Sequence, residues 1–239
     1  MASVEQVWRY PVKSMGGERV ASAAIDDRGL LGDRRFAVVD DEGRLASGKT
    51  SRRFRRRDAV FGFVARVERE RVVVEDAADV AGSWDAGDPA LDGHLSKVMG
   101  AAVRVLAEAQ TPHFDQEAVS IIGTATLAWC TREFGIDADA RRLRPNLVVT
   151  TDAPFEEETW VGRDLAVGSA TLHVVERVPR CRMVDVEQVG VPAEGDWLKP
   201  LAARREGCVA VYASVARAGE VHVGDEVHVG DAIRVGEAR

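Results

Sequence analysis

The sequence is poor in cysteine, and its three cysteines lie far apart. Cys130, Cys181 and Cys208 contain no CxxC pair and form an odd number, which excludes a disulfide framework and the usual zinc or iron–sulfur cages within this chain. Long apolar runs are also missing, since stretches such as 209–211 are far shorter than the roughly 20 residues that span a bilayer. The first nine residues carry charges and no apolar block. We therefore expect no secretory leader and no membrane span, and we expect a cytoplasmic protein.

An excess of positive charge is absent too. The 39 acidic residues outnumber the 32 basic ones and give a net charge of -7. This balance argues against broad affinity for nucleic acids or membrane surfaces, because both depend on a positive field. Only four basic residues are lysine, and the other 28 are arginine, whose planar fork suits phosphate and carboxylate groups. Any anion that the protein binds must therefore meet a local basic pocket.

Several familiar catalytic motifs are missing. The five histidines show no metal-ligand spacing such as HExxH, and the sequence contains neither a GxSxG elbow nor a glycine-rich phosphate loop. The apolar share of 46% and the charged share of 30% are those of a globular protein with a real core. We therefore expect a folded protein whose chemistry does not depend on any of these three motifs.

Alternating apolar and polar residues, broken by frequent turn signals, predict a mainly β chain with a few helices. Two helices are expected, one over Pro89–Met99 that ends at Gly100 and one with Thr124 as N-cap that runs to Gly135. The stretch 221–231 repeats a short strand and a Gly-Asp turn, which is typical of a hairpin. Further strands are expected over 4–10, 35–39, 60–67, 71–75, 147–150, 164–167 and 170–177. Many short strands favour a barrel-like or sandwich architecture.

The chain offers one candidate domain boundary. The connection between Glu75 and Pro89 is rich in glycine, alanine and aspartate. We therefore predict a smaller β-barrel-like unit over residues 1–85 and a larger β-barrel-like domain over residues 86–239, packed together as one compact body.

Cys181 is the thiol with the most reactive surroundings. It is flanked by Arg180 and Arg182 and follows an apolar strand that stops at a proline. Two neighbouring guanidinium groups favour the thiolate, which is the form that attacks electrophiles or binds soft metals. Because neighbours in an extended strand point to opposite faces, this reading requires a bend at Cys181. The alternative is a small buried apolar residue, which suits Cys130 and Cys208 better.

Three short segments place polar groups at strand ends. In segment 141–146 a proline keeps Arg144 out of the helical region, so that Arg144 and Asn146 are held where a strand begins. An arginine and an amide there can bind an oxyanion or the edge of a heterocycle, although a solvated turn explains them equally well. Segment 10–14 offers a lysine and a hydroxyl, and segment 32–34 an aspartate and arginine pair.

Taken in order along the chain, these segments resemble the MOSC family, which is named for the C-terminal domain of molybdenum cofactor sulfurase. The resemblance includes the N-terminal β-barrel domain that precedes MOSC in many members, and it covers nearly the whole chain. It rests on Tyr10 to Ser14, Gly32 to Arg34, Leu143 to Val149, Glu157 to Gly162, Arg180-Cys181 and Val223 to Asp225.

The resemblance implies a β-barrel-rich fold that binds a molybdenum cofactor of the molybdopterin type. In the amidoxime-reducing branch, the cysteine that matches Cys181 ligates molybdenum. Relatives often have an arginine at the position of Lys49, and we add Lys49 to the expected cofactor-binding residues. The positions that match the pterin and phosphate contacts of that branch are Lys13, Ser14, Arg34, Asp115, Arg144 and Asn146. Pyridoxal phosphate binding is a further possibility at the level of the family.

The activity that the resemblance implies is the two-electron reduction of N-hydroxylated or other N–O substrates by a Cys181-bound molybdenum. Such a reductase needs electrons from an external flavin or iron–sulfur protein, because this chain lacks the cysteines for its own cluster. Two alternatives remain: a sulfur carrier that uses a Cys181 persulfide, and a cofactor-binding module without turnover. Val178 replaces the first cysteine of a Cys-x-Arg-Cys pattern common in relatives, which argues against a paired-thiol relay. Gln116 and Glu117 replace small hydroxyl residues, and a glutamate there would repel a phosphate.

Overall fold

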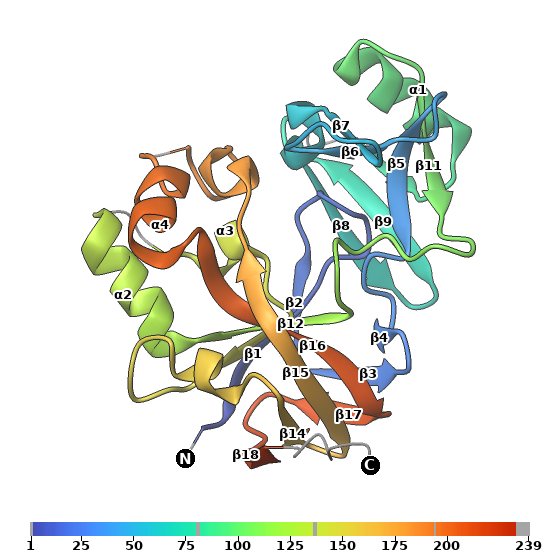
Figure 1. Cartoon of the computed structure of the whole chain (residues 1–239). Helices are drawn as coiled ribbons and strands as arrows, with labels where there is room; N and C mark the ends of the chain where they lie inside the picture. The colour runs from blue at the N-terminus through green and yellow to red at the C-terminus, as the bar shows by residue number, and fades with distance from the viewer. Residues whose placement is uncertain (1, 80–81, 136–137, 194, 233–239) are drawn as a thin grey trace, which may run out of the picture.

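The computed structural model describes residues 2–79, 82–135, 138–193 and 195–232. Its largest element is an eight-stranded sheet, drawn in the lower part of Figure 1. In spatial order its strands are β18 (Val227–Ala232), β14 (Arg163–Val167), β15 (Ala170–Pro179), β16 (Cys208–Arg217), β12 (Val119–Gly123), β13 (Leu147–Val149), β1 (Val4–Arg9) and β2 (Glu18–Val20). The pairings are antiparallel except between β12 and β13, which run parallel.

Three smaller sheets complete the β structure. One joins β17 (Gly219–His222), β3 (Ser22–Asp26) and β4 (Gly29–Leu30) beside the large sheet. The other two lie in the upper part of Figure 1, which we call the upper lobe; the part around the eight-stranded sheet is the lower lobe. The first of these sheets consists of β11 (Val103–Ala107), β5 (Phe36–Asp40), β6 (Leu45–Ser47) and β7 (Phe54–Arg56). The second consists of β10 (Ser83–Asp85), β9 (Arg71–Asp76) and β8 (Phe63–Glu68). The expectation of a β-rich fold is therefore confirmed.

Four α-helices are present in the described residues. They are α1 (Pro89–Met99), α2 (Thr124–Phe134), α3 (Ala140–Leu143) and α4 (Leu198–Arg205). Short 3-10 helices occupy Asp58–Gly62, Glu156–Trp160 and Arg182–Asp185. Both expected helices are confirmed, and each ends at a glycine in the left-handed region, which an achiral residue adopts without steric cost. No helix in the described part of the chain combines the length and the apolar character needed to cross a membrane.

Two of the four apolar clusters among the described residues form the main cores of the two lobes. The larger lies on the eight-stranded sheet and includes Val7, Ile121, Leu165 and Val211, all at most 1% exposed. The smaller fills the upper lobe around Phe61 and other side chains from β5, β8, β9, β11 and α1. In the large sheet β12 is buried along its whole length, which explains why its residues do not alternate regularly between apolar and polar.

The structure corrects three details of the expected elements. Residues Val60–Gly62 belong to a 3-10 helix, so the strand expected from residue 60 begins at Phe63. Gly123 is the N-cap of α2 and Thr124 its first residue, because a short β12 runs directly into the helix. The stretch 221–231 is not a hairpin: β17 pairs with β3 and β18 pairs with β14, so its Gly-Asp turn connects two different sheets.

Strands from both ends of the chain share one sheet. The backbone amide of Val4 donates to the carbonyl of Asp225 at 2.8 Å, and β1 and β2 continue the sheet that β12 to β16 and β18 build. Conversely, α1 and β11 lie after residue 85 in the sequence but pack in the upper lobe (Figure 1). The division at residues 85 and 86 stays a prediction, and residues 233–239 of the second expected domain lie outside the described residues.

Candidate functional site

A cavity of about 220 Å³ lies where the two lobes meet. It is lined by side chains from segments that are far apart in the sequence, on the turn after β1, the turn before β5, the loop after β6, the segment before β12, the turn between α3 and β13, and the end of β15. We call it the site cavity. All eight residues proposed from the sequence line it, namely Lys13, Ser14, Arg34, Lys49, Asp115, Arg144, Asn146 and Cys181.

Cys181 stands at a change of chain direction. It follows the last residue of β15 and precedes the 3-10 helix Arg182–Asp185, and its side chain is half-buried in the cavity wall. Arg180 donates from Nε and Nη2 to the carbonyl of Val209 and from Nη1 to that of Leu143 at 2.8 to 3.0 Å. Arg180 therefore fixes the end of β15, and the acceptors of these three hydrogen bonds are carbonyl oxygens and no carboxylate.

Arg182 turns away from the cavity and joins the lobes. Its Nη1 and Nη2 form a bidentate ion pair with the two oxygens of Asp58, at 2.8 and 2.7 Å. Asp58 lies on the 3-10 helix of the upper lobe, one turn from the buried Phe61. This pair holds the segment that follows Cys181 against the other lobe.

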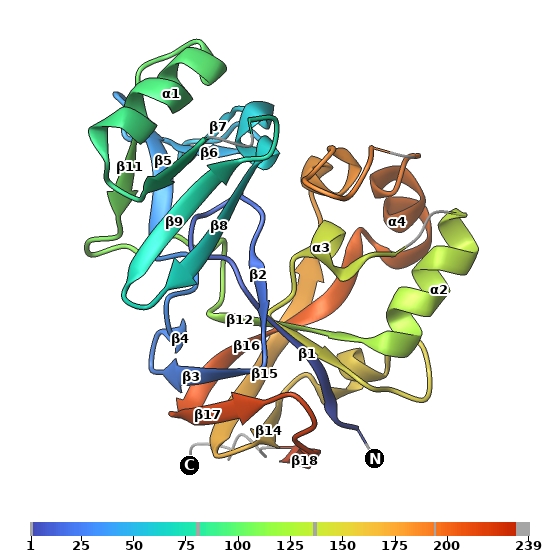
Figure 2. The ribbon, with the colours of Figure 1, turned by 180° about the vertical axis from the view of Figure 1, so that it is seen from behind.

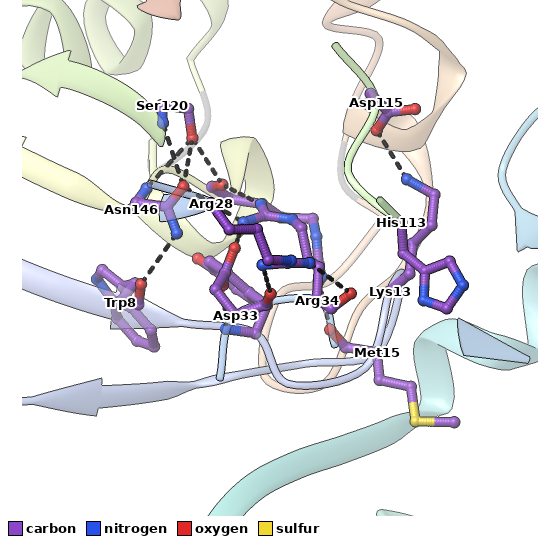
Figure 3. A network of polar contacts seen from close by, with 12 residues as sticks. Trp8, Lys13, Met15, Arg28, Asp33, Arg34, His113, Asp115, Ser120 and Asn146 are labelled. Carbon is purple, nitrogen blue, oxygen red and sulfur yellow. Dashed lines mark hydrogen bonds and ion pairs between the residues drawn. The ribbon is translucent and has the colours of Figure 1, made fainter. Parts of the chain in front are cut away.

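Two lysines and one carboxylate form the cationic wall of the cavity. Lys13 Nζ lies 3.1 Å from one oxygen of Asp115, as Figure 3 shows, and Lys49 Nζ lies 3.3 Å from the other. Both ammonium groups also sit over the ring of Phe54, at 5.0 and 4.7 Å from its centre. Burial lowers the pKa of Lys13 to about 8 despite the attraction of Asp115. Burial alone would raise the pKa of Asp115, but Lys13 and Lys49 outweigh it and hold that pKa well below its usual value.

The side chain of Arg34 is held by contacts with Asp33, Arg144 and Tyr10. It pairs through Nη1 with the buried Asp33, whose other oxygen accepts the backbone amide of Tyr10 at 2.7 Å. Its Nη2 donates to the carbonyl of Arg144 at 3.1 Å, and its guanidinium lies 5.0 Å from the centre of the Tyr10 ring. Asp33 therefore balances the positive charge of Arg34, as the contact between them in Figure 3 shows, while the Arg34 side chain lines the cavity.

Arg144 and Asn146 are held at the entrance of β13, as their sequence context indicates. Arg144 is 5% exposed and donates from Nη1 to the carbonyl of Met15 at 2.6 Å, and its Nη2 has no hydrogen-bond partner within the described residues. Burial lowers the pKa of Arg144 to about 10. Asn146 Oδ1 accepts the backbone amide of Ser120 at 3.1 Å, and its Nδ2 donates to the carbonyl of Trp8 at 3.3 Å.

Three of the cavity residues have strained backbones. Ser14, Arg34 and Arg144 adopt positive φ angles of 69°, 50° and 54°, which cost non-glycine residues roughly 1 kcal/mol or more each. Such residues persist only where the surrounding structure determines them, and they cluster at functional sites. Their presence on one cavity indicates a surface shaped for a ligand.

The charge and donor set of the cavity suits an anion that carries a thiophilic metal. Its lining contains Lys13, Lys49, Arg34, Arg144 and Arg180 against the carboxylates of Asp115 and Glu117. The buried, unpartnered Nη2 of Arg144 adds a donor for a ligand oxygen, and Cys181 adds a soft sulfur. Within the described part of the chain, no three His, Cys, Asp or Glu side chains gather as a metal cage. The residues present therefore fit a metal that arrives with ligands of its own.

Several wall residues were not singled out from the sequence. Ser120 sits inside an otherwise apolar strand and is 6% exposed, and Tyr212 lies directly opposite it on β16. Burial raises the pKa of the Tyr212 hydroxyl. A polar residue in an apolar strand was the available signal for Ser120, whereas Tyr212 reads as an ordinary strand aromatic. Ser47 and Phe114 also line the cavity.

The other two cysteines lie outside the cavity lining. Cys130 is completely buried in α2, and burial raises the pKa of its thiol to about 12, which makes it inert at neutral pH. Cys208 begins β16, where its thiol contacts the carbonyl of Glu206 at 3.8 Å. Cys181 is thus the one cysteine of the described residues whose side chain lines the site cavity.

The sequence matches two family models and several known proteins. The model of the MOSC N-terminal beta barrel domain matches residues 1–86 and that of the MOSC domain residues 95–228. Mitochondrial amidoxime reducing component 2 of Bos taurus is 24% identical, over 94% of this chain and 82% of that protein. Molybdenum cofactor sulfurase 2 of Aedes aegypti is 22% identical over 84% of this chain, which spans only 28% of that protein.

A solved structure supports the fold. The YuaD protein of Bacillus subtilis aligns over 96% of both chains with a TM-score of 0.55 and 16% sequence identity. At this identity the likeness concerns the fold alone. Because the MOSC domain model matches more than half of the sequence, behind a match to the MOSC N-terminal beta barrel domain, this chain belongs to the MOSC domain family.

Proposed function

We propose that the site cavity binds a molybdenum cofactor of the molybdopterin type and that the sulfur of Cys181 ligates its metal. The observation that carries the proposal is the convergence of Cys181 and seven polar residues, from segments between positions 13 and 181, on one cavity. The name of the insect relative, molybdenum cofactor sulfurase, supports the same cofactor, and the name of the mammalian relative, amidoxime reducing component, supports a reduction at an N–O bond.

The cationic wall would hold the phosphate end of the cofactor. Lys13 and Lys49 share one carboxylate, Asp115, so this pair keeps a net positive charge that a phosphate neutralises. Arg144 would give its unpartnered Nη2 to a ligand oxygen. Asn146 and Ser120 already hydrogen-bond to each other, which fixes the orientation of the amide that would bind the ring system of a pterin.

We infer that the activity is the two-electron reduction of an N-hydroxylated substrate. The N–O bond breaks, two electrons and two protons are consumed, and the products are the reduced nitrogen compound and water. When bound, the cofactor supplies the site that accepts the oxygen atom and passes the electrons. Tyr212 is partly buried, its hydroxyl stays protonated at neutral pH because burial raises its pKa, and it would donate a hydrogen bond to the departing oxygen. The electrons come from an external flavin or iron–sulfur protein.

A turnover assay tests the reaction. The full chain, produced in a host that makes molybdenum cofactor, is given benzamidoxime and a chemically reduced viologen dye as electron donor. Formation of benzamidine that is lost in Cys181→Ser and kept in Cys208→Ser would support the proposal, because only Cys181 faces the cavity. Tight cofactor uptake with no turnover of any N-hydroxylated compound would instead identify a binding module.

A persulfide on Cys181 is the second candidate function. It is favoured by the half-buried position of this thiol on an open cavity and by the similarity to a molybdenum cofactor sulfurase. The chain would then accept a sulfur atom from a persulfide donor and pass it to an acceptor. Intact-mass spectrometry after exposure to such a donor would show one added sulfur, absent in Cys181→Ala, if this function holds.

A further inference from the structure

A second cavity of about 330 Å³ lies between the lobes and shares Arg144 with the site cavity. Its lining comes from β1, β2, β8, α3 and the turn after the 3-10 helix Arg182–Asp185. Figure 2 shows from behind the strands β1, β2 and β8 and the helix α3, which contribute residues to this lining. Cys181 and the two lysines of the site cavity do not line it.

The second cavity is cationic. Arg19, Arg141 and Arg144 line it, and its described lining contains no aspartate or glutamate. Arg141 is paired with Asp139 at 2.6 Å, so the positive excess rests on Arg19 and Arg144. Arg19 donates from Nη2 to the carbonyl of Glu5 at 3.2 Å, a contact that leaves its charge uncompensated. In a protein with a net charge of -7, such a lining marks a place for an anion.

The same cavity has an aromatic wall. Trp8 and Tyr10 both line it and stack on each other, with ring centres 6.2 Å apart and planes inclined by 16°. The guanidinium of Arg144 lies 4.3 Å from the centre of the Tyr10 ring. A flat ring that enters here meets an aromatic surface, and an acidic group on that ring meets the arginines.

Two buried polar groups at this wall are unsatisfied. Tyr10 is 1% exposed and Arg144 is 5% exposed, yet neither Tyr10 Oη nor Arg144 Nη2 has a hydrogen-bond partner among the described residues. A buried polar group without a partner costs about 1–3 kcal/mol. In the cofactor-free chain, a ligand oxygen beside Arg144 would supply a missing acceptor at a guanidinium that already stacks on the aromatic wall.

We propose that this second cavity is a binding site for an aromatic anion, that is, a flat ring that carries a carboxylate or a phosphate. Arg19 and Arg144 bind the acidic group, and Trp8 and Tyr10 contact the ring. The site borders the cofactor site through Arg144, which lines both cavities, and its occupation requires neither molybdenum nor turnover.

Calorimetric titration of the purified full chain tests the proposal. The probes are phenyl phosphate and benzoate, with inorganic phosphate and cyclohexanecarboxylate as probes that lack the aromatic ring. We expect a dissociation constant of about 1 mM or lower for at least one aromatic anion and weaker binding of the non-aromatic ones. The comparison of phenyl phosphate with benzoate identifies which acidic group the arginines prefer.

Three variants locate the bound anion. Arg19→Gln, which removes an arginine of the second cavity, is expected to weaken binding by about tenfold or more. Arg66→Gln, on the same strand as the lining residue Val64 but outside the cavity, and Lys49→Gln in the site cavity are expected to leave binding unchanged. Loss of binding in Lys49→Gln but not in Arg19→Gln would place the anion in the site cavity and overturn the proposal. Absence of binding to the wild-type chain would overturn it as well.

Discussion

Replacement of Lys13 by methionine is predicted to stabilise the protein while it abolishes the binding of an anionic ligand. The side chain of Lys13 is 4% exposed, and burial lowers its pKa from 10.5 to about 8. At about 1.4 kcal/mol per pKa unit, the charged lysine costs the folded state about 3 kcal/mol. The attraction to Asp115 is already contained in this value, because it contributes to the same pKa.

The direction of the pH dependence follows from the pKa of Lys13, which is 10.5 in the unfolded chain and about 8 in the folded protein. Below pH 8 the lysine is charged in both the folded and the unfolded chain, so the whole cost is present. As the pH rises from 8 to 10.5 the folded protein loses this proton before the unfolded chain does, and the cost disappears. The gain in stability of Lys13→Met over the wild type should therefore be largest at neutral pH and close to zero above pH 10.5.

Urea unfolding of the cofactor-free chain at pH 7 and pH 10 measures the gain. Lys97→Met, which changes an exposed lysine on α1, serves as the control and should alter the stability by no more than about 0.5 kcal/mol at either pH. If Lys13→Met unfolds at lower urea than the wild type at pH 7, or if its gain is the same at both pH values, the reasoning about a buried charged lysine is wrong. A stabilised variant that no longer retains cofactor would show that this charge is kept for binding.

Three further changes have defined outcomes. Gly17→Ala should lower the free energy of unfolding by about 1–3 kcal/mol in urea titrations, because an added Cβ would stand 2.5 Å from the ring of Tyr10; an unchanged midpoint would refute the packing described there. Cys181→Ser should change the stability by less than about 1 kcal/mol, since its thiol lines a cavity; a larger loss would assign Cys181 to the core. A double-mutant cycle of Arg182→Gln and Asp58→Asn should give a coupling energy of about 0.5–1 kcal/mol, because both groups are partly exposed; zero coupling would show that the pair does not join the lobes.

The sequence predicted the strands and helices where a local rule governs the backbone. Gly100 and Gly135 mark the ends of α1 and α2 because a helix that stops in the left-handed region favours glycine. The stretch 221–231 was misread because the pattern of strand and turn is the same whether neighbouring strands pair with each other or with distant partners. Which strand pairs with which is decided by contacts between residues far apart in the sequence.

The candidate site was visible from the sequence only as separate pieces. A proline after Arg144 and a bend at Cys181 mark unusual backbone, but nothing local shows that Lys13 and Asp115 meet across 102 positions. The resemblance to a known family joined these pieces, and the structure then brought them onto one cavity. Tyr212 escaped detection because a partly buried tyrosine in a strand has the same sequence context whether or not it borders a cavity.

The central claim is that Cys181 and the cationic wall together hold a molybdenum cofactor. The most direct test is elemental and pterin analysis of the full chain purified from a host that makes the cofactor, with Cys181→Ser and Cys208→Ser prepared in parallel. We predict molybdenum and pterin in equal amounts in the wild type and in Cys208→Ser, and loss of molybdenum in Cys181→Ser. Wild-type protein that contains neither molybdenum nor pterin would contradict the claim.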